Sequence, residues 1–222
     1  MTPERFRNLK AALLRRQPDL TVLADEVHKA HNIAAVLRTC DAVGVFEIHS
    51  VATGNSFVRA LGISGGTAPR VGVHAHGALS PAINTLKDKG FQIVAAHLTT
   101  AAEDYRSIDY TLPTALLLGS ELRGVCAVGA ALADRHASLP MRGLAASLNV
   151  SVAAGLFLYE AARQREAAGV YTQCRLSAEQ FERTLFEWCH PDIAARCKRK
   201  GLPYPPLTTD GDRAANPFAN SA

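Results

Sequence analysis

FQIVAAHL, at residues 91–98, and TALLLG, at residues 114–119, are continuous apolar runs in the middle of the chain. Such runs are typical of strands that are buried on both faces of a sheet. Further strands are predicted, with helices between them, at residues 21–25, 46–52, 71–76 and 137–141. Because strands that alternate with helices form βαβ units, the sequence predicts an α/β protein with a mostly parallel sheet flanked by helices.

Helices are predicted at both ends of the chain as well as between the strands. The first begins at Thr2-Pro3, where a hydroxyl cap precedes a proline at the first helical position, and runs to about Arg16. The others are predicted at residues 33–44, 80–90, 124–134, 149–168, 177–189 and 192–199, with a glycine-rich loop and short helix at 54–66. The predicted organisation is an N-terminal basic helix (1–18), an α/β domain (19–168), a C-terminal helical extension (169–206) and a disordered tail (207–222).

Composition excludes several classes of protein. Of the 222 residues, 48% are hydrophobic and 20% are charged, which excludes disorder over the whole chain and a fibrous repeat. No apolar run reaches the ~18 residues of a membrane span, and the charged N-terminus lacks a signal-peptide core, so we expect a cytoplasmic protein outside the membrane. The five cysteines form no CxxC pair and the eight histidines no HExxH, so neither a disulfide framework nor a metal site is predicted.

The positive charge lies at the two flanks of the chain. Residues 1–16 hold five basic groups and one acidic group, residues 163–200 hold eight and five, and the stretch between them is slightly acidic. Basic flanks on a nearly neutral body suit a polyanion such as nucleic acid. Two solvated helix faces explain the same charge equally well.

In a parallel sheet, ligands bind at the carboxyl ends of the strands, which points to the loops at 96–100, 119–124 and 139–148. The second loop, GSELRG, fits neither GxGxxG nor a P-loop, so a nucleotide-dependent oxidoreductase is weakly supported. Glu121 can accept a hydrogen bond from a ligand or stabilise the start of the next helix through its dipole.

Two other motifs have equally plain structural explanations. In LPMRGLAASLNVSVAAG, at residues 139–155, Ser147 and Asn149 precede an apolar helix and can cap it or orient a substrate hydroxyl. In HNIAAVLRTCDAVGV, at residues 31–45, Asn32 precedes a helix, and Arg38 can form a surface ion pair with Asp41. None of the three motifs is decisive by itself.

Taken together and in this order, the three segments resemble the motifs of the SpoU family of RNA ribose 2′-O-methyltransferases. RRQPDLTVLADEVHKAHN, DYTLPTALLLG and KRKGLPYP are further similar to its TrmH subgroup, which methylates guanosine 18 of tRNA, and the resemblance spans residues 3–206. It implies that residues 19–168 are a methyltransferase domain whose C-terminal part forms a deep trefoil knot of the SPOUT type. Such knots are rare exceptions to the rule against threaded chains.

The resemblance also implies the cofactor and the partners. The cofactor is S-adenosylmethionine, the substrate is tRNA, and the enzyme is a homodimer whose site is completed across the subunit interface. By position, the residues expected to contact the cofactor are Ala96, Leu98, Gly119, Leu139, Met141 and Leu148. The residues expected to contact tRNA from the terminal helices are Arg5, Arg7, Lys10, Arg15, Arg16, Lys198, Arg199 and Lys200.

By the same resemblance Arg38 has the catalytic role, and the residues around it are Asn32, Glu121, Ser147 and Asn149. An arginine is a poor base because its pKa lies above ~12. We therefore expect Arg38 to hold the RNA phosphate and the 2′-oxygen together and to stabilise the developing oxyanion. Two candidates for the proton acceptor stay open: a neighbouring phosphate, and the guanidinium itself with a shifted pKa.

The chain departs from the subgroup pattern at two single positions and in the run Arg142-Gly143-Leu144-Ala145 that follows Pro-Met. Leu122 stands where a lysine is usual after the motif glutamate, and Ala146 stands where a glutamine commonly precedes the motif serine. Arg123 or Arg142 can supply the missing positive charge. The alternatives are a related enzyme that methylates another tRNA position or rRNA, and a non-catalytic knotted protein that binds RNA.

Overall fold

The computed structural model describes residues 1–51 and 70–218, so the glycine-rich loop predicted at 54–66 and the last four residues of the predicted tail lie outside it. The chain forms two compact units. The larger comprises Gln17–Val170, and the smaller comprises Met1–Arg16 together with Tyr171–Ala222. No helix in the described part of the chain has both the length and the apolar composition needed to cross a membrane.

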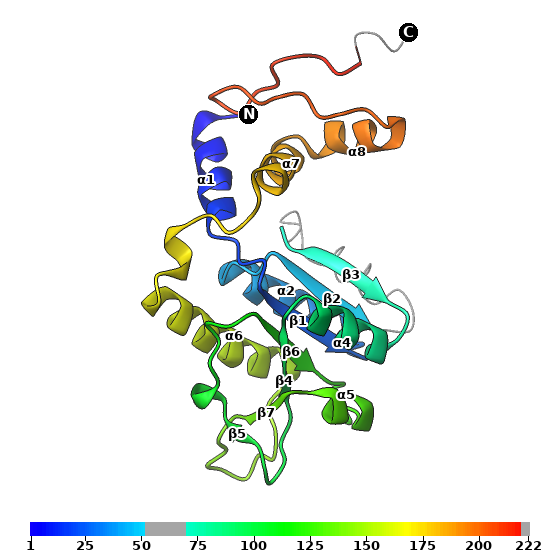
Figure 1. Cartoon of the computed structure of the whole chain (residues 1–222), viewed down its shortest axis with the longest axis vertical. Coiled ribbons are helices and arrows are strands. Elements are labelled where there is room, and N and C mark those ends of the chain that lie inside the picture. Colours follow the sequence, from blue (N-terminus) through cyan, green and yellow to red (C-terminus); the bar gives the residue numbers. More distant parts are fainter. Residues whose placement is uncertain (52–69, 219–222) are drawn as a thin grey trace. The chain divides into compact units, whose positions relative to one another are not determined.

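The larger unit is built on a seven-stranded sheet with the order β3-β2-β1-β6-β4-β7-β5, and every neighbouring pair is parallel (Figure 1). This confirms the predicted parallel α/β class. The strands are β1 (Leu20–Asp25), β2 (Glu47–Val51), β3 (Gly72–His76), β4 (Gln92–Ala96), β5 (Glu103–Asp104), β6 (Thr114–Leu118) and β7 (Arg135–Ser138).

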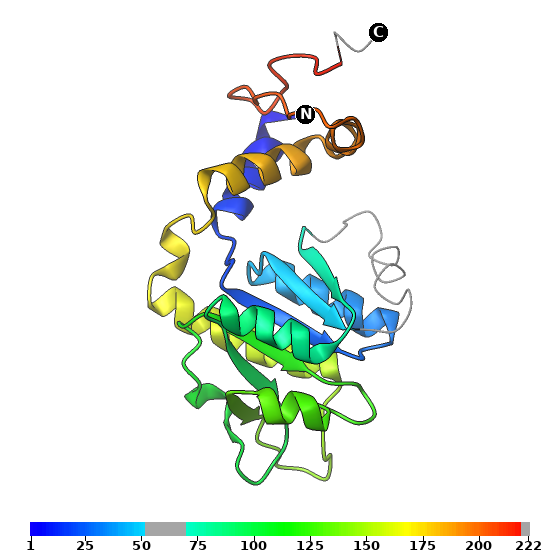
Figure 2. The ribbon, with the colours of Figure 1, turned by 45° about the vertical axis from the view of Figure 1, so that its right-hand side comes forward.

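Helices cover both faces of the sheet, as Figure 2 shows from a second side. α2 (Ala30–Ala42) and α6 (Val150–Ala167) pack on one face, and α4 (Leu79–Asp88) and α5 (Ala127–Leu132) pack on the other. Because side chains alternate along a strand, Leu116 and Leu118 of β6 join the α2–α6 core, whereas Leu117 joins the core beneath α4. Burial on both faces explains why this strand is apolar along its whole length.

The strand predicted at residues 137–141 is shifted toward the N-terminus, since β7 ends at Ser138. Pro140 has no N–H with which to continue the ladder, so the chain leaves the sheet just before it. Leu139 and Met141 are therefore loop residues rather than strand residues. β5, at the edge of the sheet, is only two residues long and has too little pattern to be predicted from the sequence.

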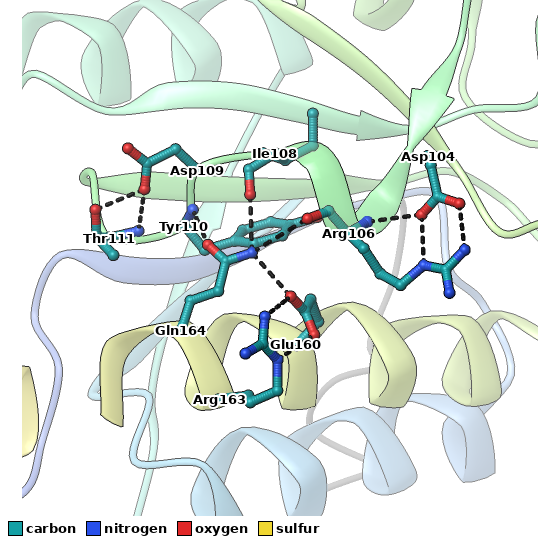
Figure 3. A network of polar contacts seen from close by, with 9 residues as sticks. All are labelled: Asp104, Arg106, Ile108, Asp109, Tyr110, Thr111, Glu160, Arg163 and Gln164. Carbon is teal, nitrogen blue, oxygen red and sulfur yellow. Dashed lines mark hydrogen bonds and ion pairs between the residues drawn. The ribbon is translucent and has the colours of Figure 1, made fainter. Parts of the chain in front are cut away.

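Polar contacts with α6 fix the segment that leads into β6. The Gln164 amide donates to the carbonyl oxygen of Ile108 at 3.0 Å and accepts from the N–H of Tyr110 at 2.9 Å, as drawn in Figure 3. The fully buried guanidinium of Arg165 donates to the Tyr110 carbonyl oxygen at 2.8 Å and to Asp19 Oδ1 at 2.7 Å. These bonds join α6 to the start of β6 and to the residues just before β1. The 3₁₀ turn η1 (Tyr105–Ser107) lies within the same segment.

The smaller unit contains α1 (Pro3–Leu14), α7 (Ala178–Cys189) and α8 (Pro191–Lys200), and the short turn η2 (Val170–Thr172) falls at the boundary between the units. Thr2 caps α1 by accepting from the backbone N–H of Arg5, as the sequence predicts. α7 begins with a capping box in which Ser177 and Gln180 each bond the other's backbone.

The composition of residues 207–222 predicts disorder, and the structure describes them as far as residue 218. Leu207 and Arg213 form an isolated antiparallel bridge, and Gly211 at φ +83° lies between them. A Cβ on Gly211 would lie 2.3 Å from the ring of Phe6, so only glycine fits at this position. Asp212 also accepts from the N-terminal amine at 3.3 Å.

Candidate active site

A cavity of about 620 Å³ lies at the carboxyl ends of β4, β6 and β7, within the size range of ~300–1,000 Å³ typical of small-molecule sites. Besides Lys29 and residues of α6, three segments line it: the residues after β4, the turn after β6, and the loop between β7 and α6. They are the loops to which the rule for parallel sheets points. Its apolar floor includes Leu118 and Phe157, which are both almost fully buried.

The structure brings most of the expected site residues together around this cavity. All six residues expected to contact the cofactor line it, namely Ala96, Leu98, Gly119, Leu139, Met141 and Leu148. Glu121, Ser147 and Asn149 line it as well. Asn32 and Arg38 lie outside the lining residues.

The turn after β6 brings backbone groups into very close approach. The N–H of Gly124 donates to the carbonyl oxygen of Ser120 at 2.9 Å, and Gly124 has φ +66°. A Cβ built on Gly119 would lie 2.0 Å from the carbonyl carbon of Gly124, a distance that no side chain could occupy. The two glycines therefore let this turn close on itself and leave its backbone accessible to a ligand.

A chain of hydrogen bonds connects the three motif segments. The amide Nδ2 of Asn32 donates to Glu121 Oε1 at 2.8 Å, and Asn32 Oδ1 accepts from Asn149 Nδ2 at 3.1 Å. Asn149 Oδ1 in turn accepts from both the N–H and the hydroxyl of Ser151, at 2.8 and 2.6 Å. Asn32 is 2% exposed, so it supports the cavity from behind rather than lining it.

These contacts keep Glu121 charged. Burial raises the pKa of Glu121, but the hydrogen bond from Asn32 and those from three backbone N–H groups, including that of Lys29, lower it by more. The result is a pKa below the usual value for a glutamate. Glu121 is therefore a carboxylate at neutral pH, with an oriented acceptor oxygen at the cavity.

Arg38 lies on a different side of α2 from Asn32. The two are six positions apart, which is about 240° around a helix. Asn32 is buried, whereas Arg38 is exposed and is not among the residues that line the cavity of its own chain.

Ser151 belongs to the polar chain, although the sequence reasoning did not select it. The signal was available, because a capping asparagine accepts hydrogen bonds from N–H groups in the first turn of its helix. Lys29 and His97 line the cavity and were also missed. Lys29 follows β1 closely in the chain, at the end of the sheet where ligands bind, but a single lysine in a loop gives no distinguishing pattern.

Comparison with known proteins agrees with this geometry. The SpoU rRNA Methylase family profile matches residues 19–159, and the SpoU rRNA methylase C-terminal profile matches residues 163–215. The chain belongs to the SpoU methylase family. Its membership implies the knotted C-terminal segment expected from the sequence.

The chain is similar to SpoU relatives over nearly its whole length. It is 44% identical to the tRNA (guanosine(18)-2′-O)-methyltransferase of Escherichia coli (strain K12) over 218 residues, covering 97% of this chain and 95% of that protein. It is 46% identical to the Thermus thermophilus enzyme of the same name, covering 84% of this chain and 96% of that protein.

Solved SpoU structures share the fold. The A. aeolicus TrmH/SpoU tRNA modifying enzyme superposes with a TM-score of 0.79 at 40% identity, covering 86% of this chain and 97% of that one. The SpoU methyltransferase AviRb from Streptomyces viridochromogenes, in complex with the cofactor AdoMet, superposes with a TM-score of 0.61 at 26% identity. The superposition covers 69% of this chain and 64% of that one.

The expected tRNA contacts of this SpoU protein lie in its smaller unit, and all but one are exposed. Those on the surface are Arg5, Arg7, Lys10, Arg15, Lys198, Arg199 and Lys200. Arg16 is only 2% exposed, and its guanidinium lies 5.1 Å from the centre of the Trp188 ring. Because it is packed inside the unit, Arg16 does not present its charge to a phosphate.

Proposed function

We propose that this protein transfers the methyl group of S-adenosylmethionine to the ribose 2′-oxygen of guanosine 18 in tRNA. The observation that supports it best is that one cavity gathers the six expected cofactor residues with Glu121 and Asn149. The sequence that forms it is 44% identical over 97% of its length to an enzyme with this activity. A tRNA substrate also implies that the protein works in the cytoplasm.

The residues of the cavity fit S-adenosylmethionine. The close approach of Gly119 to Gly124 leaves backbone groups exposed at one wall, and Leu98, Leu139 and Leu148 provide apolar surface for a planar base. Bound there, the cofactor would supply an electrophilic methyl group on a sulfonium. The apolar walls would exclude water from the methyl group, which would otherwise compete with the ribose hydroxyl.

We assign Arg38 to charge stabilisation. An arginine side chain is a cation, so Arg38 can hold an RNA phosphate beside the 2′-oxygen and stabilise negative charge as it develops there. Asn32 is a positioning residue, because it touches Glu121 and Asn149 rather than the cavity. Glu121, Ser147 and Asn149 are at the cavity wall, where they can orient the ribose.

The protein is, in this proposal, a homodimer in which Arg38 of each subunit serves the cavity of the other. Two observations support it. Arg38 is exposed and is not among the residues lining its own cavity. On α6, Val152, Leu156 and Tyr159 are 51%, 42% and 60% exposed and follow one another at helical spacing, which forms an apolar face suited to a subunit contact.

The smaller unit is the proposed tRNA-binding unit. The exposed residues among the expected tRNA contacts lie on α1, at its C-cap and in the last turn of α8, and one of them, Lys198, is 2.9 Å from Glu187. A substrate with a regular phosphate backbone suits such a distributed set of charges.

Mapping the methylated nucleotide tests the proposal. The full-length protein is incubated with labelled S-adenosylmethionine and an unmodified tRNA transcript, and the label is located by nuclease digestion. We expect label at guanosine 18, and none on a matched transcript with a 2′-deoxyguanosine at that position. Label at another tRNA position supports a related enzyme, as does label that appears only when rRNA replaces the tRNA in the incubation. No label with RNA binding intact supports a non-catalytic protein.

A further inference from the structure

Two cations, Lys29 and Arg123, lie at the cavity and have no part in the mechanism above. We propose that they form an anion site that holds the phosphodiester backbone of the RNA next to the target ribose. This inference rests on the proposed function and deepens it, since it assigns two residues to substrate binding within the larger unit.

The two cations come from different segments that meet at Glu121. Lys29 is the N-cap residue of α2, and Arg123 belongs to the turn after β6. The backbone N–H of Lys29 donates to Glu121 Oε1 at 3.3 Å, and Glu121 precedes Arg123 by two residues. The fold therefore brings two basic residues that are far apart in the sequence into the lining of one cavity.

Glu121 does not neutralise these cations. Its charge is compensated by the Asn32 amide and by backbone N–H groups, and neither the Lys29 ammonium nor the Arg123 guanidinium is among the causes that shift its pKa. Within residues 1–51 and 70–218, neither cation forms an ion pair with an acidic side chain. Both are exposed, so their charge is available to an anion from outside.

The position of the charges favours RNA over the cofactor as the source of the anion. The floor of the cavity is apolar and almost fully buried, whereas Lys29 and Arg123 are solvent-exposed. A phosphate keeps much of its hydration when it binds at such an exposed position. Next to Arg123 in the same cavity wall is Leu122, which is 92% exposed and offers apolar surface to a nucleoside.

Arg142 provides a matched control. It is exposed like Arg123 and lies in the loop after β7, but it does not line the cavity. Its charge instead contributes to lowering the pKa of Asp104, whose main partner is Arg106.

The test compares Lys29→Gln, Arg123→Gln and Arg142→Gln in the full-length protein. Binding of unmodified tRNA is measured across a range of salt concentrations, and binding of S-adenosylmethionine alone is measured by calorimetry. For the first two variants we expect tRNA binding to weaken roughly three- to tenfold and the slope of log K against log salt to fall by about 0.7 to 0.9. Cofactor affinity should stay within about twofold, and Arg142→Gln should match the wild type.

A variant that adds a positive charge gives a second, independent test of the anion site. Leu122→Lys adds a third cation next to Arg123 and should steepen the salt dependence of tRNA binding by a similar amount. Weakened cofactor binding with an unchanged salt slope in Lys29→Gln and Arg123→Gln would show that the anion is the cofactor carboxylate, and it would overturn the proposal. The proposal would also be overturned if Lys29→Gln, Arg123→Gln and Leu122→Lys all bound tRNA like the wild type. If the Lys29→Gln and Arg123→Gln variants show the reduced salt slope but the wild-type protein places no label on guanosine 18, the anion site is supported and the assigned reaction is rejected.

Discussion

The side chain of Asn32 donates a 2.8 Å hydrogen bond to Glu121, a residue 89 positions away in the chain. The same side chain accepts a 3.1 Å hydrogen bond from Asn149, which is 117 positions away. One buried amide thus connects α2, the turn after β6 and the start of α6, the three segments whose motifs identify the family. The precision of the proposed site depends on this amide, since no loop holds both Glu121 and Asn149 by itself.

Removal of this amide should damage the site and the fold together. Asn32→Ala leaves Glu121 and Asn149 without their shared partner, so the free energy of unfolding should fall by about 1–3 kcal/mol. The pKa of Glu121 should rise, and the acid limb of the pH–rate profile for tRNA methylation should move to higher pH. Thr39→Ala, which removes a hydroxyl that donates to the Ala35 carbonyl oxygen within the same helix, is the control and should change neither measurement. An unaltered pH profile in Asn32→Ala would contradict the positioning role.

Subunit mixing tests whether Arg38 acts across an interface. Arg38→Ala and Glu121→Ala should each abolish methylation, and Arg38→Ala should still bind the cofactor. If each site combines the cavity of one subunit with Arg38 of the other, random exchange should restore about one quarter of the wild-type activity. Differently tagged subunits would verify that exchange has occurred. Exchanged but inactive mixtures would be inconsistent with a shared site.

Gly119 should be intolerant of a single methyl group. A Cβ there would lie 2.0 Å from backbone atoms of Gly124, so Gly119→Ala must open the turn, and cofactor affinity should fall at least about tenfold with a loss of ~1–3 kcal/mol in stability. Gly143→Ala is the matched control in the loop after β7, because its Cβ would meet nothing within 4 Å. Calorimetric titration with S-adenosylmethionine and chemical denaturation measure the two effects. Equal behaviour of the two variants would argue against a backbone-lined cofactor wall.

Arg165 should be essential to the larger unit, although it is remote from the proposed chemistry. Its side chain is fully buried and donates to Asp19 Oδ1 at 2.7 Å and to the carbonyl oxygen of Leu112 at 3.0 Å. Arg165→Met leaves these acceptors without a hydrogen-bond donor. The free energy of unfolding, measured with denaturant, should therefore fall by about 3–5 kcal/mol. Arg163→Ala removes a side chain that is 66% exposed from its pair with the 10% exposed Glu160, and it should cost at most about 1 kcal/mol. A small loss for Arg165→Met would mean that water replaces its bonds.

Stability should fall as the solution is acidified from pH 6.5 to pH 4, and His49 should be one cause. Burial, followed by the nearby His74 and His76, lowers the pKa of His49 from 6.5 to about 4. Because the folded-state pKa lies below the unfolded value, the stabilisation is complete above pH 6.5 and is lost as the pH falls toward 4. The shift corresponds to a loss on the order of 3 kcal/mol. Denaturation at several pH values should show that stability depends less steeply on pH in His49→Asn than in the wild type.

Local patterns were sufficient for the parts of the protein that are governed by periodicity and capping. The apolar runs at 91–98 and 114–119 predicted two buried strands, and β4 and β6 lie within them. Asn149 was identified as a cap, and it accepts from Ser151 at the start of α6. The rule for parallel sheets located the three loops that form the cavity, because strand direction follows from the order of strands and helices alone.

The sequence by itself thus determined the parallel α/β class, the family and the residues that meet at the carboxyl ends of the strands. Only the tertiary structure decided which basic and polar side chains face outward. Arg16 belongs to the same basic cluster as Arg15, yet it is packed against Trp188, 172 positions away. Asn32 and Arg38 belong to one motif, yet one is buried between segments and the other is exposed. Charge and motif membership are local properties, whereas the exposure of a side chain depends on which distant segments pack against it.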